Sequence, residues 1–287
     1  MTISKTCFIL GLPAAGKTSY LAALAYSLQQ RRVETKLHWA KFSGNQQYLG
    51  NLAKIWLTAE PVLRTSIASQ QNQISVYLED LTGKIYDINF PDLSGEIFQK
   101  QYIDREIDAS LVDHIINCNG FLLFINPEEI IEPELISELP LKTRLAPVEF
   151  ELKERNAAKN DPTEVQLVSL LQDIDFLQKG KQKPLMIVIS AWDMIKGIYS
   201  IPERFIEERT PLLWQYLKAN ERIFSTSYFG VSAQGGALDT SEQSEALIEQ
   251  YEENPAERIL VINSAGEESH DITLPLWEVM NHMPEMF

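Results

Sequence analysis

The stretch G-L-P-A-A-G-K-T at residues 11–18 constrains the fold of this chain more than any other feature. It lies between an apolar run at residues 6–12 and an Ala- and Leu-rich segment at residues 17–32 whose apolar residues recur at helical spacing. The pattern G-x-x-x-x-G-K-[ST] between a strand and a helix is typical of a P-loop, because main-chain N–H groups and a helix N-terminus can surround a phosphate only where side chains are small. The sequence therefore predicts an α/β P-loop NTPase fold.

Each residue type in this loop has an expected part in holding a nucleotide with Mg²⁺. Gly11 and Gly16 allow the backbone to approach the β-phosphate, and Lys17 reaches the β- and γ-phosphate oxygens. The Thr18 hydroxyl is expected to ligate Mg²⁺. The residues predicted to contact the nucleotide here are Gly11, Ala14, Ala15, Gly16, Lys17, Thr18 and Ser19.

Strands alternate with helices along the rest of the chain. The predicted strands cover residues 6–12, 73–80, 84–90, 120–126, 184–193 and 225–236. This order predicts a six-stranded, mostly parallel sheet with helices on both faces, and the hairpin at 73–90 supplies one antiparallel edge strand. We expect a single domain over residues 1–287, with insertions at about 127–161 and 237–269, which are rich in acidic and polar residues.

Composition excludes several classes of function. The 40 acidic and 25 basic residues give a formal net charge of −15, which disfavours binding to nucleic acid and to anionic membranes. No stretch approaches the roughly 18 uninterrupted apolar residues of a membrane-spanning helix. The two cysteines, Cys7 and Cys118, lie in apolar stretches and are interpreted as small core residues in a reducing compartment. We therefore expect a cytoplasmic protein.

A second phosphate-site element follows the predicted hairpin. Asp92 and Gly95 form D-x-x-G directly after the strand at 84–90. Asp92 is expected to hold Mg²⁺ through a water, and Gly95 is expected to bring its N–H group to the γ-phosphate. Thr65 is the best placed threonine for Mg²⁺ and the γ-phosphate. Arg64 beside it is either a cation that stabilises the transferred charge or a surface residue.

A base-binding site is predicted after the last two strands. Asp193 lies at the carboxyl end of the strand predicted at 184–193, where its carboxylate can accept hydrogen bonds from guanine N1 and N2, donors that adenine lacks. The other interpretation of Asp193 is a residue that caps the strand end. Ser232 and Ala233 follow the last strand, where a backbone N–H group can meet guanine O6.

These four elements in this order resemble the P-loop GTPases of the Ras-like TRAFAC class, and more narrowly the bacterial double-GTPase group. The motifs that carry the resemblance are GLPAAGKT at 11–18, DLSGE at 92–96, SAWD at 190–193 and SAQ at 232–234. The resemblance covers most of the chain and implies a Ras-like fold that binds GTP or GDP with Mg²⁺. It also implies a role in a bacterial conflict or defence system, with a protein effector, a GTPase-activating-like partner or a second GTPase domain as partner.

The chain departs from the family pattern at three positions. Ser190 stands in place of Asn or Thr, and Ala191 in place of the Lys that packs on the base. Trp192 beside them either offers apolar surface to the base or belongs to the core. Glu96 stands in place of the Gln that follows D-x-x-G, where it either orients the attacking water or repels an anionic transition state. We therefore expect a slow GTPase with Lys17, Glu96 and Arg64 as its catalytic residues.

Two other classes of function are compatible with the same residues. One is a nucleotide-binding scaffold without turnover, and the other is an ATP-dependent P-loop enzyme. The nucleotide preference of an Asp193→Ala variant separates the ATP-dependent enzyme from the GTPase. The hydrolysis rate of the wild-type protein, compared with that of variants at Glu96 and Arg64, separates the scaffold without turnover from the GTPase.

Overall fold

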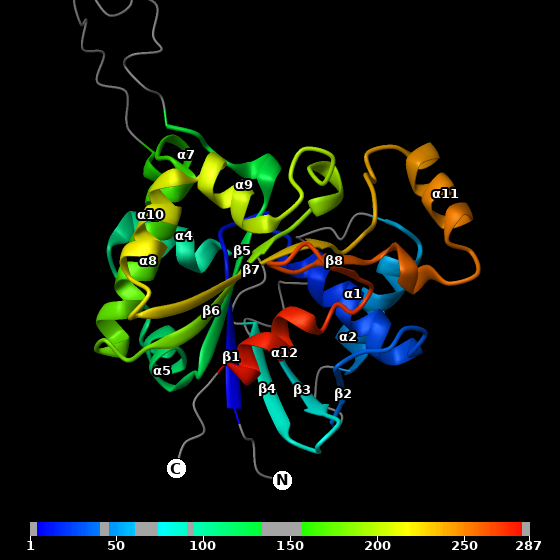
Figure 1. Ribbon diagram of the computed structural model, residues 1–287, viewed down its shortest axis with the longest axis horizontal. Coiled ribbons are helices and arrows are strands. Elements are labelled where there is room, and N and C mark those ends of the chain that lie inside the picture. Colours follow the sequence, from blue (N-terminus) through cyan, green and yellow to red (C-terminus); the bar gives the residue numbers. More distant parts are fainter. Residues whose placement is uncertain (1–4, 41–45, 61–73, 91–94, 134–155, 283–287) are drawn as a thin grey trace, which may run out of the picture.

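The computed structural model describes residues 5–40, 46–60, 74–90, 95–133 and 156–282. Within these residues a single mixed sheet lies between two layers of helices (Figure 1). The strands are β1 (Lys5–Leu10), β2 (Leu37–Trp39), β3 (Ile74–Asp80), β4 (Ile85–Phe90), β5 (Gly120–Ile125), β6 (Lys183–Ile189), β7 (Phe224–Ser232), β8 (Leu260–Ile262) and β9 (Glu268–Ser269).

The described part of the sheet has nine strands in the order β2-β3-β4-β1-β5-β6-β7-β8-β9. The five central strands, β4, β1, β5, β6 and β7, run parallel to one another. The outer strands are antiparallel to their neighbours at both ends of the sheet. The α/β P-loop fold with a mostly parallel sheet and helices on both faces is thus confirmed.

The sheet is larger than the six strands predicted from the sequence, and both of its edges are antiparallel instead of one. All six predicted strands are present, and β2, β8 and β9 are added. The added strands have three, three and two residues, which is too short for alternation of apolar and polar residues to be recognised.

Ten α-helices and three short 3₁₀ helices are found in the described residues. The α-helices are α1 (Lys17–Gln30), α2 (Gln46–Leu57), α4 (Glu96–Asp104), α5 (Ala109–Asn117), α7 (Ala157–Asn160), α8 (Thr163–Gln178), α9 (Pro202–Arg209), α10 (Pro211–Ala219), α11 (Ser241–Gln250) and α12 (Leu274–Asn281). The 3₁₀ helices are η2 (Pro127–Glu129), η3 (Trp192–Met194) and η4 (Pro255–Arg258). None of the described helices has both the length and the apolarity needed to cross a bilayer.

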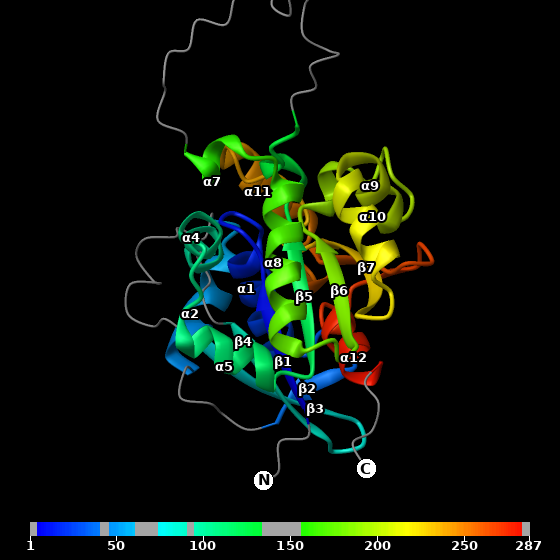
Figure 2. The ribbon, with the colours of Figure 1, turned by 90° about the vertical axis from the view of Figure 1, so that its left-hand side faces the viewer.

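The two helix layers cover opposite faces of the sheet (Figure 1), and α8 lies in front of the strands when one of these layers faces the viewer (Figure 2). Ile9 and Leu122 pack into the core on the side of α1, α2 and α12, whereas Phe8 and Leu123 pack into the core beside α4, α5, α8, α9 and α10. All six residues of β5 are buried, as expected for a central strand covered on both faces. Because the crossover helices cover both faces, the carboxyl ends of the parallel strands are left to form the site.

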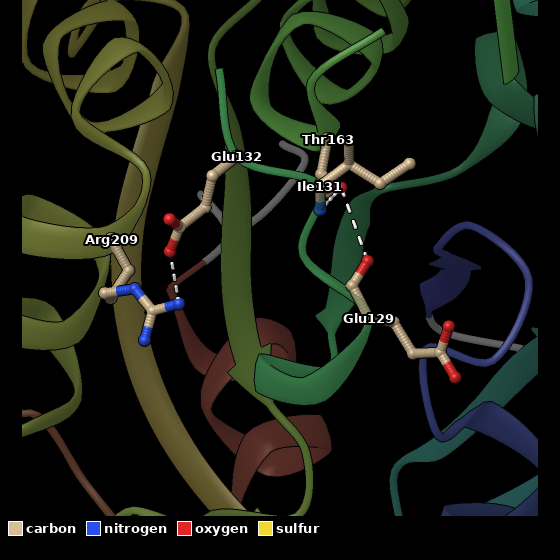
Figure 3. Close-up of polar contacts among 5 residues, drawn as sticks. All are labelled: Glu129, Ile131, Glu132, Thr163 and Arg209. Atoms are coloured by element: carbon tan, nitrogen blue, oxygen red, sulfur yellow. Dashed lines mark hydrogen bonds and ion pairs between the residues drawn. The ribbon is translucent and has the colours of Figure 1, made fainter. Parts of the chain in front are cut away.

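The segment predicted as an insertion at 127–161 is attached to the domain at its beginning. The Thr163 hydroxyl accepts a hydrogen bond from the Ile131 N–H group at 2.9 Å and donates to the Glu129 carbonyl at 3.4 Å (Figure 3). Glu132 forms an ion pair with Arg209 of α9. Residues 134–155 lie outside the described residues.

The segment predicted as an insertion at 237–269 contributes to the sheet. Its strand β8 pairs with β7, with Val231 opposite Val261. The same segment holds α11, which contacts the turn after α2 through a hydrogen bond from the Ser244 hydroxyl to the Ala59 carbonyl at 3.0 Å. The segment at 237–269 therefore contacts both β7 and the residues that follow α2, two elements that are far apart in the sequence.

Candidate nucleotide-binding site

The loop between β1 and α1 has the backbone geometry that its two glycines predict. Gly16 has a φ of 91°, in the left-handed region that favours glycine, and α1 begins at the next residue. A Cβ on Gly16 would lie 2.6 Å from the Cβ of Ser190, which follows β6. Gly16 thus allows the loop after β6 to contact the P-loop directly.

Lys17 is almost fully buried, with 2% of its surface exposed. Its Nζ donates to the carbonyl oxygens of Gly11 at 2.7 Å and Leu12 at 2.9 Å. The ammonium group therefore lies over the loop, where phosphate oxygens would compete with these carbonyls for its protons. The role of Lys17 in contacting phosphate stays a prediction.

A cavity of about 240 Å³ opens beside the P-loop. It is lined by residues that follow four parallel strands, β1, β5, β6 and β7. Its lining includes Ala14, Gly16 and Ser19 of the P-loop region, Asn126 and Glu128 after β5, Ala191, Asp193 and Met194 after β6, and Ala233, Gln234 and Gly236 after β7. Ligands of α/β folds bind at the carboxyl ends of the strands, so this cavity is the expected place for a nucleotide.

The structure brings two of the three predicted base-site residues to the cavity wall. Asp193 in η3 and Ala233 after β7 both line it. Ser232 is 1% exposed, and its hydroxyl accepts a hydrogen bond from the Gly235 N–H group at 3.0 Å. The described contact of the Ser232 side chain therefore shapes the turn that follows β7.

Trp192 belongs to the core. Its side chain is fully buried, and a Cβ on Gly230 would lie 2.3 Å from the indole ring. Of the two interpretations of this residue, the structure supports packing in the core and not contact with the base. Ala191, by contrast, lines the cavity and has a φ of 46°.

Asn126 is a site residue that the sequence reasoning missed. Its side-chain amide donates to the Ala14 carbonyl at 3.0 Å, and its oxygen accepts from the Glu128 N–H group at 3.1 Å. Ala14 has a φ of 60°, an unfavourable conformation for a residue with a Cβ, and the contact with Asn126 helps to hold it. The signal in the sequence was an Asn directly after a continuous apolar strand.

The D-x-x-G element contacts the P-loop through its glycine. Gly95 has a φ of 79°, and a Cβ on this residue would lie 2.5 Å from the carbonyl carbon of Leu12. Glu96 follows as the first residue of α4 and is exposed. Three other residues predicted to act on Mg²⁺ or the γ-phosphate lie outside the described residues: Arg64, Thr65 and Asp92.

Two further residues of the P-loop, Ala15 and Thr18, are among the described residues. Ala15 is 4% exposed, and its N–H group donates to the Leu12 carbonyl at 3.3 Å, which closes the turn. Thr18 lies in the first turn of α1, and the hydroxyl oxygen at this position is a hard ligand of the kind that Mg²⁺ prefers. The donor chemistry therefore fits Mg²⁺, with Thr18 as the described ligand candidate.

Comparison with known proteins gives one family. The family model described as Double-GTPase 1 matches residues 8–279. A comparison with curated proteins gives no match.

Several solved structures of GTPases are similar to this chain at low sequence identity. The GTPase-like domain of S. cerevisiae Ski7 bound to GTP has 17% identity and a TM-score of 0.44, over 82% of this chain and 44% of that chain. The SRb-GTP/SRX complex of the signal recognition particle receptor from Chaetomium thermophilum has 12% identity and a TM-score of 0.40, over 83% of this chain and 94% of that chain. The chain thus spans less than half the length of the Ski7 structure that it matches.

Proposed function

The chain belongs to the double-GTPase 1 family, and from this premise we propose that it is a GTP-binding switch protein that hydrolyses GTP slowly with Mg²⁺. The observation that carries the proposal is the shared cavity. Ala14 and Gly16 of the P-loop line the same cavity as Asp193 and Ala233, which are the predicted base-site residues. A purine nucleotide is a ligand that presents a base and phosphates to these two groups at once.

The base contacts follow from the chemistry of the cavity wall. The Asp193 carboxylate accepts hydrogen bonds from guanine N1 and N2, and a backbone N–H group of the loop at Ala233 donates to guanine O6. Adenine lacks the N1 and N2 donors from which the Asp193 carboxylate would accept. Asp193 is therefore the residue that selects GTP and GDP over ATP in this proposal.

The phosphate contacts follow from the P-loop. Lys17 exchanges its present bonds to the Gly11 and Leu12 carbonyls for bonds to the β- and γ-phosphate oxygens. Thr18 holds Mg²⁺ together with Asp92 and Thr65. Mg²⁺ would neutralise charge on the phosphates. This neutralisation matters more here because two further acidic residues, Glu128 and Asp239, line the cavity.

Hydrolysis in this proposal is an in-line attack of water on the γ-phosphorus. A bond forms between the water oxygen and phosphorus, the bond to the bridging oxygen breaks, and GDP and inorganic phosphate leave. Lys17 and Arg64 stabilise the charge on the transferred group, Gly95 senses the γ-phosphate, and Glu96 faces the attacking water. Turnover is slow because Glu96 stands where Ras-like GTPases have the glutamine that orients water.

We further propose that the nucleotide state is passed to a protein partner. The partner is an effector, a GTPase-activating-like protein or a second GTPase domain, and the setting is the cytoplasm of a bacterium with a conflict or defence system. Membership in a double-GTPase family supports the second GTPase domain in particular. The single domain over residues 1–287, with the segments at 127–161 and 237–269 as insertions, remains part of this proposal.

Glu96 favours a second candidate function, a nucleotide-binding scaffold without turnover. This residue is exposed at the start of α4, and a carboxylate beside the γ-phosphate repels the charge that develops on it. If single-turnover assays show no GTP hydrolysis and a partner still binds only with GTP present, the scaffold replaces the GTPase.

Calorimetric titration of GTP, GDP and ATP tests the proposal. We expect the wild-type protein to prefer GTP over ATP and the Asp193→Ala variant to lose about 10- to 100-fold of that preference, since two hydrogen bonds to a charged group are removed. Asp239→Ala is the matched control, because it removes another carboxylate from the same cavity. Equal binding of ATP and GTP by the wild-type protein would remove the proposal.

A further inference from the structure

A helix far from the base-site loop in sequence holds that loop by a hydrogen bond. Trp56 of α2 donates from its indole Nε1 to the carbonyl oxygen of Ala233 at 2.7 Å, across 177 residues of sequence. The Trp56 side chain is fully buried, and Ala233 lines the cavity. A buried side chain on α2 therefore contacts the backbone of the loop that is proposed to meet the base.

The Trp56 ring is itself in contact with two other side chains. The guanidinium carbon of Arg258 lies 3.7 Å from the centre of the Trp56 ring, and the Tyr26 ring lies on α1 with its centre 4.4 Å away. Arg258 also donates to the Trp56 carbonyl. Arg258 is 2% exposed, and its burial lowers the pKa to about 10, so the side chain remains a cation near neutral pH. The indole is thus held in one orientation by stacking and charge.

The backbone of Arg258 contacts the same loop. A Cβ on Gly235 would lie 2.4 Å from the Arg258 carbonyl oxygen, so the loop after β7 packs closely on η4 at this point. The Ser232 hydroxyl stabilises the turn by accepting a hydrogen bond from the Gly235 N–H group. Trp56 and Arg258 therefore contact the same loop after β7 at two different residues.

A bond from Trp56 to this loop is not required by burial alone. The indole Nε1 atoms of Trp192 and Trp214 are also buried, and neither has a hydrogen-bond partner among the residues that the structure describes. The bond to the Ala233 carbonyl therefore distinguishes Trp56 from these two tryptophans among the described residues.

We propose that Trp56 is a positioning residue for base recognition, which presets the loop at residues 232–236 for a purine. Because the peptide group is planar, fixing the Ala233 carbonyl on Trp56 directs the Gln234 N–H group away from α2. Both residues line the cavity, so the orientation of this peptide determines which polar groups the base meets. The inference rests on the proposed function and adds to it a residue outside the sequence motifs.

The test compares two ligands that share phosphates and differ in the base. Trp56→Phe keeps an aromatic ring beside Arg258 and Tyr26 but lacks the indole N–H group. We expect this variant to bind GTP about 5- to 10-fold more weakly than the wild-type protein, since one buried hydrogen bond is lost, and to bind Mg²⁺-tripolyphosphate equally well. Trp214→Phe is the matched control, because it removes a buried indole N–H group that has no described partner, and it is expected to bind both ligands normally.

Two results would overturn the inference while the proposed function stands. One is GTP binding by Trp56→Phe at wild-type affinity. The other is an equal loss of affinity for GTP and tripolyphosphate, which would indicate a general structural role. If the wild-type protein binds GTP no better than tripolyphosphate, the proposed function fails first, and the inference fails with it.

Hydrogen exchange on the wild-type protein provides a test that does not depend on the variant being folded. GTP is expected to slow amide exchange at residues 232–236 and in α2 beyond the slowing caused by tripolyphosphate. Exchange in α10, which lies in the opposite helix layer, serves as the reference. Equal protection of the loop and α2 by the two ligands would contradict the role of Trp56.

Discussion

Gly95 and Leu12 are in direct backbone contact, so closely that a Cβ on Gly95 would lie 2.5 Å from the Leu12 carbonyl carbon. The residue that precedes α4 therefore packs on the P-loop, although 83 positions separate the two residues in the sequence. A shift of the P-loop backbone on phosphate binding would have to move Gly95 as well. The contact between Leu12 and Gly95 therefore links the P-loop to the start of α4.

Replacing Gly95 with alanine is expected to break this connection. The new methyl group cannot fit against Leu12, and the φ of 79° is unfavourable for alanine. We expect Gly95→Ala to lower single-turnover GTP hydrolysis by about 10-fold or more, since roughly 1.4 kcal/mol of misplacement gives that factor. Rapid-quench assays with excess protein measure it.

Gly83 provides the control for backbone strain. It has a similar φ of 80°, but a Cβ there would meet no atom within 4 Å. Gly83→Ala is therefore expected to cost about 1 kcal/mol of stability and to leave hydrolysis unchanged. If both variants hydrolyse GTP alike, the contact between Gly95 and Leu12 has no part in turnover.

The second prediction concerns Asn126, which holds the Ala14 carbonyl. Asn126→Ala removes the hydrogen bond that supports a left-handed residue of the P-loop, so we expect about 3- to 10-fold weaker binding of both GTP and tripolyphosphate. This pattern differs from that of Trp56→Phe, which is expected to affect GTP alone.

Asn117→Ala is a suitable control for Asn126→Ala. The Asn117 side chain donates to the Asp113 carbonyl within α5, at an exposed position in the other helix layer. Affinities equal to those of the wild-type protein are expected for this variant. Loss of GTP affinity by Asn126→Ala with unchanged tripolyphosphate affinity would mean that Asn126 acts on the base and not on the P-loop.

The third prediction concerns the two cysteines, which are both free and fully buried. Burial raises the pKa of Cys118 to about 12 and the pKa of Cys7 well above its ordinary value. Since the thiolate is the reactive form, the native protein at pH 8 is expected to resist iodoacetamide, and the denatured protein is expected to be modified at both positions. Mass spectrometry measures the modification, and rapid labelling of native protein would contradict the described burial.

The central sheet and the P-loop could be predicted because their signals are local. The apolar runs that form β1, β5 and β6 are continuous, and the glycines around Lys17 determine the loop between β1 and α1. The position of Asp193 at the same cavity as the P-loop could also be expected, since parallel strands present their carboxyl ends at one edge of the sheet.

Features that depend on distant contacts could not be predicted. β8 consists of three apolar residues within an otherwise acidic and polar segment, and such a short island did not by itself indicate a strand that pairs with β7. The bond from Trp56 to Ala233 joins two positions whose local sequence shows no connection. Ser232 matched a motif position, but its hydroxyl is used by the turn at Gly235, which only the fold reveals.

The most direct test of the whole account is calorimetric titration of the folded wild-type protein and a Lys17→Ala variant with GTP and Mg²⁺. The account predicts one saturable site in the wild-type protein and affinity lower by about 10-fold or more in the variant, since a buried ammonium group is removed from the phosphates. Folded wild-type protein that shows no binding at millimolar GTP, or a variant that binds as tightly as the wild-type protein, would contradict it.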